Sequence, residues 1–150
     1  MQMSFGIWFA IGFVAYGAIG VALTTWRRNR HLRMLAANRS EESICQFVRS
    51  LDYRSLDTKV IRAVYESLGE WCSNGHNRHR PFPIRTTDTL LGDLKLDDED
   101  LIEVIGDVAE RCKVSLDHCE QNPWYHRVDT AGDLVHFLCA QPKQPLWPAC

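Results

Sequence analysis

LGDLKLDDEDLIEVIGDV, residues 91–108, combines a helix start with an amphipathic pattern. Asp97 is a favourable N-cap residue, and the three acids after it place carboxylates at the positive end of a helix dipole. Apolar residues then recur at spacings of three and four, which predicts one buried helix face. That face comprises Leu101, Val104, Ile105, Val108 and Cys112, whereas Glu103, Asp107 and Glu110 are expected to point to water.

Other segments on both sides of this stretch also carry helical patterns. Residues 56–72 have apolar side chains at three- and four-residue spacing, which predicts a longer amphipathic helix. Thr130, followed three residues later by Asp133, predicts a capping box that begins a last helix through residue 138. Ser40 before two glutamates predicts the start of a short helix that runs to about residue 51. No run alternates like a strand, so we expect an all-α fold.

Residues 5–26, FGIWFAIGFVAYGAIGVALTTW, contain no formal charge. As a helix this segment would be roughly 33 Å long, enough to cross a hydrocarbon core of about 30 Å. Trp8 and Trp26 lie near its ends, where indole rings prefer the headgroup region. A cleaved signal peptide fits less well, because Met1–Ser4 has no basic residue and no small-residue cleavage site follows. We therefore predict a single retained transmembrane helix.

The charges beside this span predict its orientation. Arginines follow the span and none precedes it, so the positive-inside rule places the N-terminus outside and the C-terminal domain in the cytoplasm of a bacterium. The same arginines would contact the anionic headgroups of the inner-membrane bilayer, at about 1 kcal/mol each. These membrane-proximal basic residues are Arg27, Arg28, Arg30 and Arg33.

The expected organisation has four parts. Residues 1–26 form the transmembrane anchor, and residues 27–55 form a basic stalk and a short helix. Residues 56–140 form a helical domain, and residues 141–150, with three prolines, form an irregular tail. A chain of 150 residues that is 45% hydrophobic with a net charge of −2 is ordinary for one folded domain with an appendage, and no nucleic-acid partner is expected.

Three segments resemble acyl carrier proteins, in the family's order. TLLGDL at 89–94 resembles the segment in which carriers place an apolar residue before Asp-Leu. LDDEDLIE at 96–103 resembles the recognition helix, and VDTAGDLV at 128–135 resembles the closing motif, usually Thr-Val-Gly-Asp. The likeness covers roughly residues 56–140. It implies a helical bundle whose acidic helix docks on basic patches of partner proteins.

The prosthetic-group position departs from the family pattern. Asp98 stands where carriers have the serine that holds phosphopantetheine, and Glu99 replaces the leucine after it. A carboxylate cannot accept the phosphodiester that tethers this group. Ser115 is the next serine, but it lies beyond the helix and lacks the family's Asp-Ser-Leu context. We therefore expect no phosphopantetheine and no other cofactor.

The cysteines and histidines do not predict a catalytic or metal site. In a reducing cytoplasm the six cysteines are expected to be free thiols. No pairing of a nucleophile with a base can be read from their spacing, and no phosphate-binding loop is present, so we expect no enzyme. Two candidate zinc sets lack the paired spacing of structural sites. They are Cys72, His76 and His79, and Cys112, His118 and Cys119.

The predicted function is that of a membrane-anchored, non-catalytic interaction module. Its acidic helix would dock on an unidentified protein with a basic patch, and the domain itself is expected to be monomeric. The basic loop His76–Arg85 is the second candidate interface. Two alternatives stay open: a true carrier modified at an unrecognised serine, and a small inhibitor or immunity-type protein. The predicted partner-binding residues are Asp97, Asp98, Glu99, Asp100, Glu103, Asp107 and Glu110.

Overall fold

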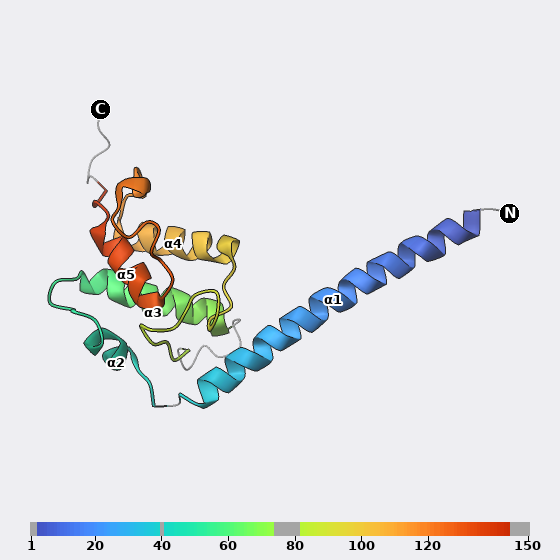
Figure 1. The fold of residues 1–150 in the computed structure, drawn as a ribbon, viewed down its shortest axis with the longest axis horizontal. Helices are drawn as coiled ribbons and strands as arrows, with labels where there is room; N and C mark the ends of the chain where they lie inside the picture. The colour runs from blue at the N-terminus through green and yellow to red at the C-terminus, as the bar shows by residue number, and fades with distance from the viewer. Residues whose placement is uncertain (1–2, 40, 74–81, 145–150) are drawn as a thin grey trace. The chain divides into compact units, whose positions relative to one another are not determined.

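The computed structural model describes residues 3–39, 41–73 and 82–144, with side chains from residue 16 onward. Figure 1 shows its helices, and the described residues contain no strand, only two isolated bridges. The predicted all-α class is therefore confirmed. The chain divides into two units, residues 1–37 and 38–150, and each is described by itself. The helices are α1 (Met3–Ala37), α2 (Ile44–Arg49), α3 (Thr58–Ser73), α4 (Asp98–Cys112) and α5 (Ala131–Ala140), with a 3-10 turn η1 (Cys119–Gln121).

The first unit is α1, a helix of 35 residues. The helix continues beyond Trp26 to Ala37, so the first part of the expected basic stalk is helical. The Arg30 guanidinium lies 5.5 Å from the centre of the Trp26 ring, a cation–π distance. Large apolar side chains in the described half of this helix are exposed, among them Tyr16, Ile19 and Val21.

The predicted transmembrane helix is not supported by the part of the chain that the structure describes. No helix there is long and apolar enough to cross a bilayer. Side chains of residues 5–15, the first half of the predicted span, lie outside the described residues.

The second unit is built around α3. This helix packs against α2, α4 and α5, so its apolar stripe meets three neighbours. Asp57 precedes the helix, and its carboxylate accepts a hydrogen bond from the Lys59 amide at 2.8 Å, as an N-cap does. The predicted helix over 56–72 is therefore confirmed with a start at Thr58. Its fully buried residues include Val60, Ile61, Val64 and Leu68.

The short helix α2 begins later than predicted. Ser40 lies outside the described residues, and Ser43 is the residue before the first turn. The Ser43 amide donates to Gln46 Oε1 at 3.0 Å, so the reciprocal side chain of the cap comes three residues after Ser43. Phe47 attaches this helix to the core, because it is 2% exposed and contacts the Tyr65 ring edge to face at 5.3 Å between ring centres.

Residues 141–144, the first part of the expected irregular tail, form no helix and contact the domain through one bridge and several polar contacts. Val114 and Lys143 form an isolated antiparallel bridge. The Ser115 amide donates to Pro142 O at 2.8 Å, and Lys143 Nζ lies 2.7 Å from Asp57 Oδ2. This segment therefore links the end of α4 to the start of α3. The rest of the predicted tail, residues 145–150, lies outside the described residues.

Candidate functional site

The first turn of α4 has the predicted cap. The Asp100 amide donates to Asp97 Oδ1 at 2.8 Å, and the Asp97 amide donates in return to Asp100 Oδ2 at 3.4 Å. Leu94 and Leu96 are buried just before the cap, with the exposed Lys95 between them at φ 57°. Because the two leucines are buried in the core, the start of α4 is held in place on the protein surface.

The buried face of α4 is narrower than predicted. Val104 and Val108 are fully buried, as expected, and Ala109 is 4% exposed. The predicted core residue Ile105 is only half-buried, as are Leu101 and Cys112. Among the helices of this unit, α3 is the main neighbour of α4, so only the stripe that faces α3 is fully covered.

The seven predicted partner-binding acids have different environments. Asp97 and Asp100 are engaged in the cap described above. Asp107 accepts a hydrogen bond from Arg111 Nε at 2.9 Å, and this arginine also reaches Glu70 at 3.2 Å. Asp107 therefore has an ion-pair partner on the domain, although its side chain is still 37% exposed to water. The other four acids are exposed and have no ion pair with any described residue: Asp98, Glu99, Glu103 and Glu110.

An apolar side chain lies among these four carboxylates. Ile102 is 69% exposed and lies one turn from Asp98 and Glu99 on the same side of α4. Gly106 follows it one turn later, and a Cβ built there would meet nothing within 4 Å. The exposed face of α4 thus presents one isoleucine, with open space beside it and carboxylates around it. Sequence reasoning missed Ile102, because it lies between Leu101 and Glu103 and outside the apolar stripe that predicts the buried face.

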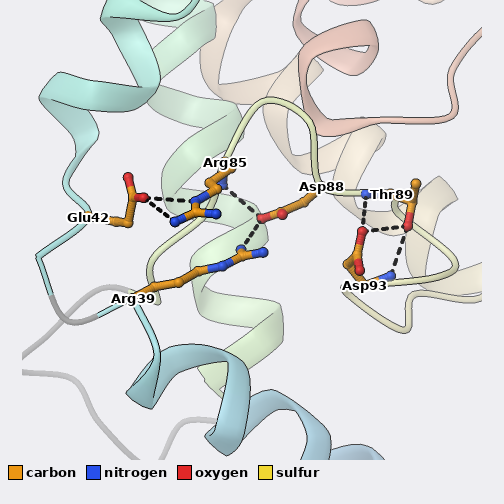
Figure 2. A network of polar contacts seen from close by, with 6 residues as sticks. All are labelled: Arg39, Glu42, Arg85, Asp88, Thr89 and Asp93. Atoms are coloured by element: carbon orange, nitrogen blue, oxygen red, sulfur yellow. Dashed lines mark hydrogen bonds and ion pairs between the residues drawn. The ribbon is translucent and has the colours of Figure 1, made fainter.

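The segment before α4 forms a closed turn (Figure 2). Asp93 Oδ2 accepts hydrogen bonds from the Thr89 amide at 2.9 Å and from Thr89 Oγ1 at 2.8 Å, and Thr89 Oγ1 accepts one from the Asp93 amide. Gly92 lies inside this turn, where an added Cβ would come within 2.4 Å of Thr89 Oγ1. The sequence TLLGDL therefore specifies a particular turn geometry that positions the chain leading into α4.

This turn and the start of α5 lie side by side. The Leu90 amide donates to Asp129 O at 3.0 Å, and the Ala131 amide donates to Asp88 O at 2.9 Å. The predicted cap of α5 is confirmed, since the Thr130 hydroxyl lies 2.7 Å from Asp133 Oδ2. The structure thus brings together two of the three segments that resemble carrier motifs, a contact that the sequence spacing alone did not predict.

Asp88 holds a buried polar network that the sequence did not reveal (Figure 2). Its carboxylate is 3% exposed and lies 2.6 Å from Arg39 Nη1. The same oxygen accepts the Arg85 amide at 2.8 Å. The Arg85 side chain in turn lies 2.6 Å from Glu42. The residues just after α1 are therefore fastened to the turn that precedes α4.

Ser115, the remaining serine candidate, does not occupy a helix start. It lies after α4, where its Oγ donates to Asp117 Oδ2 at 2.9 Å and accepts the Asp117 amide at 3.1 Å. Its backbone amide is bonded to Pro142 O. Asp98, by contrast, is exposed at the first position of α4, which is the carrier-like position.

The candidate nucleophiles and metal ligands are not assembled into a site in the described part of the chain. Burial raises the pKa of the Cys112 and Cys139 thiols, which lowers their thiolate fraction at neutral pH. No group of three or more His, Cys, Asp or Glu residues among the described residues is placed to hold a metal ion. His76 and His79 lie outside these residues, as does most of the basic loop His76–Arg85.

Comparison with known proteins gives no assignment. No protein-family model matches this sequence, and no curated protein or solved structure is significantly similar to it.

Proposed function

We propose that this chain is a non-catalytic, carrier-like interaction module that docks on a basic patch of a partner protein through the exposed face of α4. The observation that carries the proposal is the exposure of four carboxylates on that face, none of which has an ion pair with a described residue. Asp98, Glu99, Glu103 and Glu110 are exposed and have no ion pair among the described residues. A group of unpaired carboxylates on a protein surface speeds association with a basic surface.

Ile102 adds an apolar contact to this electrostatic one. Its side chain is 69% exposed, whereas the valines on the opposite side of α4 are fully buried. Apolar side chains at the centre of an interface supply much of the binding energy, and charges at the rim supply steering and specificity. An acidic helix with one central isoleucine therefore fits a partner that presents a shallow apolar depression with basic residues around it.

The proposal includes the absence of phosphopantetheine. Asp98 occupies the carrier-like position and cannot receive a phosphodiester, and its carboxylate favours the first turn of the helix. Intact mass spectrometry after co-expression with a broad-specificity phosphopantetheinyl transferase should show only the unmodified mass. An adduct mapped to Ser115 or to any other serine would contradict this proposal and favour a true carrier.

We also propose that residues 5–26 anchor the module in the cytoplasmic membrane, with the domain in the cytoplasm. The support is the uncharged sequence of this segment and the arginines directly after it. A phosphatase fused after residue 150 should be inactive, and a cytoplasmic reporter at the same place should be active. The reverse pattern would refute this orientation.

Docking is tested by charge reversal on α4 in the full chain. Glu99→Lys with Glu103→Lys should weaken capture of the partner at least tenfold, and capture by the parent should fall as salt rises. The matched control is Glu41→Lys with Glu66→Lys, because these acids are also exposed but lie outside α4. Equal capture by both double variants would show that the interface is not on α4.

A further inference from the structure

A cavity of about 510 Å³ is lined by residues of α2 and of the first turns of α3, within the second unit. Ile44, Val48 and Tyr53 supply its apolar lining. Ile44 and Val48 are half-buried, and Tyr53 is 43% exposed. Phe47 attaches α2 to the core, so the other side of the short helix is left open to the cavity.

Three cations surround this apolar lining. Arg49 comes from α2, and Lys59 and Arg62 come from α3. No carboxylate lines the cavity, and none of the three cations has an ion pair with a residue that the structure describes. Elsewhere in this unit Arg39, Arg85, Arg111 and Lys143 are paired with acids, whereas Arg54, Lys95, Lys113 and Arg127 also have no ion pair with a described residue. The cavity therefore matches an occupant that brings carboxylates around an apolar side chain.

The exposed face of α4 has the complementary chemistry. We propose that this cavity, which we name the α2–α3 pocket, binds the α4 face of a second copy of this chain. Ile102 enters the pocket, and Glu99 and Glu103 face Lys59 and Arg62. The acids are four residues apart on α4, roughly 6 Å along the axis, and the bases are three residues apart on α3, roughly 4.5 Å. The two pairs of charges thus have similar separations.

The proposed contact is head-to-tail. Each copy offers its α4 face to one neighbour and its α2–α3 pocket to another, so the interface is heterologous and can extend beyond two copies. A net charge of −2 gives little overall repulsion between copies. This inference rests on the proposed function, because it names a second copy as a partner of the α4 face.

The test uses the full chain in zwitterionic detergent micelles at low salt, with association followed by sedimentation velocity. The pocket variant is Lys59→Glu with Arg62→Glu, and the helix variant is Glu99→Lys with Glu103→Lys. We expect the parent to associate and each variant to associate at least tenfold more weakly. An equimolar mixture of the variants should recover association, because the intact α4 face of the pocket variant meets the intact pocket of the helix variant, and the two reversed surfaces also carry opposite charges. Arg127→Glu, an exposed cation outside the pocket, is the control and should behave like the parent.

Several outcomes would overturn the inference. The inference would be overturned if the parent stayed monomeric up to near-millimolar concentration. It would also be overturned if both variants still associated, because the association would then come from another part of the chain, such as α1. If each variant lost association and the mixture did not recover it, the proposed pairing of the α4 face with the α2–α3 pocket would be excluded. If the pocket variant lost affinity only for micelles containing phosphatidylglycerol, the pocket would bind lipid headgroups instead.

The same variants separate this inference from the proposed function. If the helix variant loses capture of a different protein while the parent does not self-associate, docking through α4 stands and the second copy is excluded. If the helix variant changes neither capture nor self-association, both proposals fail.

Discussion

Asp88→Ala removes the carboxylate at the centre of the polar network after α1. That carboxylate is 3% exposed, and the side chain of its partner Arg39 is 11% exposed. The substitution leaves the Arg39 guanidinium without its partner at 2.6 Å and the Arg85 amide without its acceptor at 2.8 Å. The Arg39 guanidinium lies where water has little access, so water replaces its ion pair poorly, whereas Arg85 is an exposed residue.

The expected loss of stability follows from these two contacts. Removing one member of a buried ion pair costs about 3–5 kcal/mol, because the remaining charge is left uncompensated. The residual exposure of Arg39 favours the lower end, and the lost hydrogen bond of the Arg85 amide adds about 1 kcal/mol. We expect a loss of about 4 kcal/mol in the free energy of unfolding. For a domain of this size that lowers the Tm by about 16 °C.

The assay is thermal unfolding of the full chain in micelles, followed by near-ultraviolet circular dichroism, which reports tertiary packing. Arg39→Ala and the double variant complete a double-mutant cycle, and the double variant should be about as unstable as either single variant. Glu41→Ala is the control, because this acid lies in the same segment and is exposed. A Tm for Asp88→Ala within a few degrees of the parent, or fully additive losses in the cycle, would refute this reasoning.

Three further predictions concern α4, its preceding turn and the start of α3. Val104→Asp should prevent folding because it buries an unpaired charge, whereas Ile102→Asp on the exposed face should leave the Tm nearly unchanged. Gly106→Ala should raise the free energy of unfolding by about 0.5–1 kcal/mol, because the added Cβ meets nothing within 4 Å. Gly92→Ala should lower it by about 1–3 kcal/mol, because the added Cβ would lie 2.4 Å from Thr89 Oγ1. The hydrogen bond from Lys143 lowers the pKa of Asp57, so this carboxylate stabilises the fold above its unfolded pKa and loses that effect as the pH falls through its folded pKa. Asp57→Asn should therefore lower stability by about 0.2–1 kcal/mol at pH 7, and the difference should shrink below about pH 4.

Each of these predictions has a contradicting result in urea or thermal unfolding. Equal melting of Val104→Asp and Ile102→Asp would reverse the assigned faces of α4. A stabilised Gly92→Ala would mean that the turn relaxes without loss of its hydrogen bonds. A stability difference between Asp57→Asn and the parent that grows toward acid pH would reverse the sign of the linkage.

The helices that were predicted correctly are those whose signals are local. Asp97 and Thr130 each have their capping partner three residues away, so the start of α4 and that of α5 could be read from short stretches. The start of α2 was predicted too early, because Ser40 and Ser43 are both favourable N-cap residues and the structure uses Ser43, directly before Ile44. Ile105 fits the apolar period of α4, yet its burial depends on how far α3 covers that side.

The contacts that were missed join residues far apart in sequence. Arg39 and Asp88 are 49 positions apart, and nothing near either residue indicates the other. The α2–α3 pocket depends in the same way on how α2 lies against α3. Ile102 lies outside the apolar stripe that predicts the buried face of α4, so the sequence pattern drew no attention to its side chain.

The ion pair between Asp57 and Lys143 closes a loop of 86 residues, which has a consequence for the order of folding. Closing a loop of that length costs about 4 kcal/mol of chain entropy, whereas an exposed pair of this kind returns about 0.2–1 kcal/mol. The pair therefore cannot draw the chain together, and we expect it to form only after α3, α4 and α5 have packed. A contact absent from the transition state affects the rate of unfolding and leaves the rate of folding unchanged. We therefore expect residues 141–144 to slow the unfolding of a structure that the buried helices assemble without them.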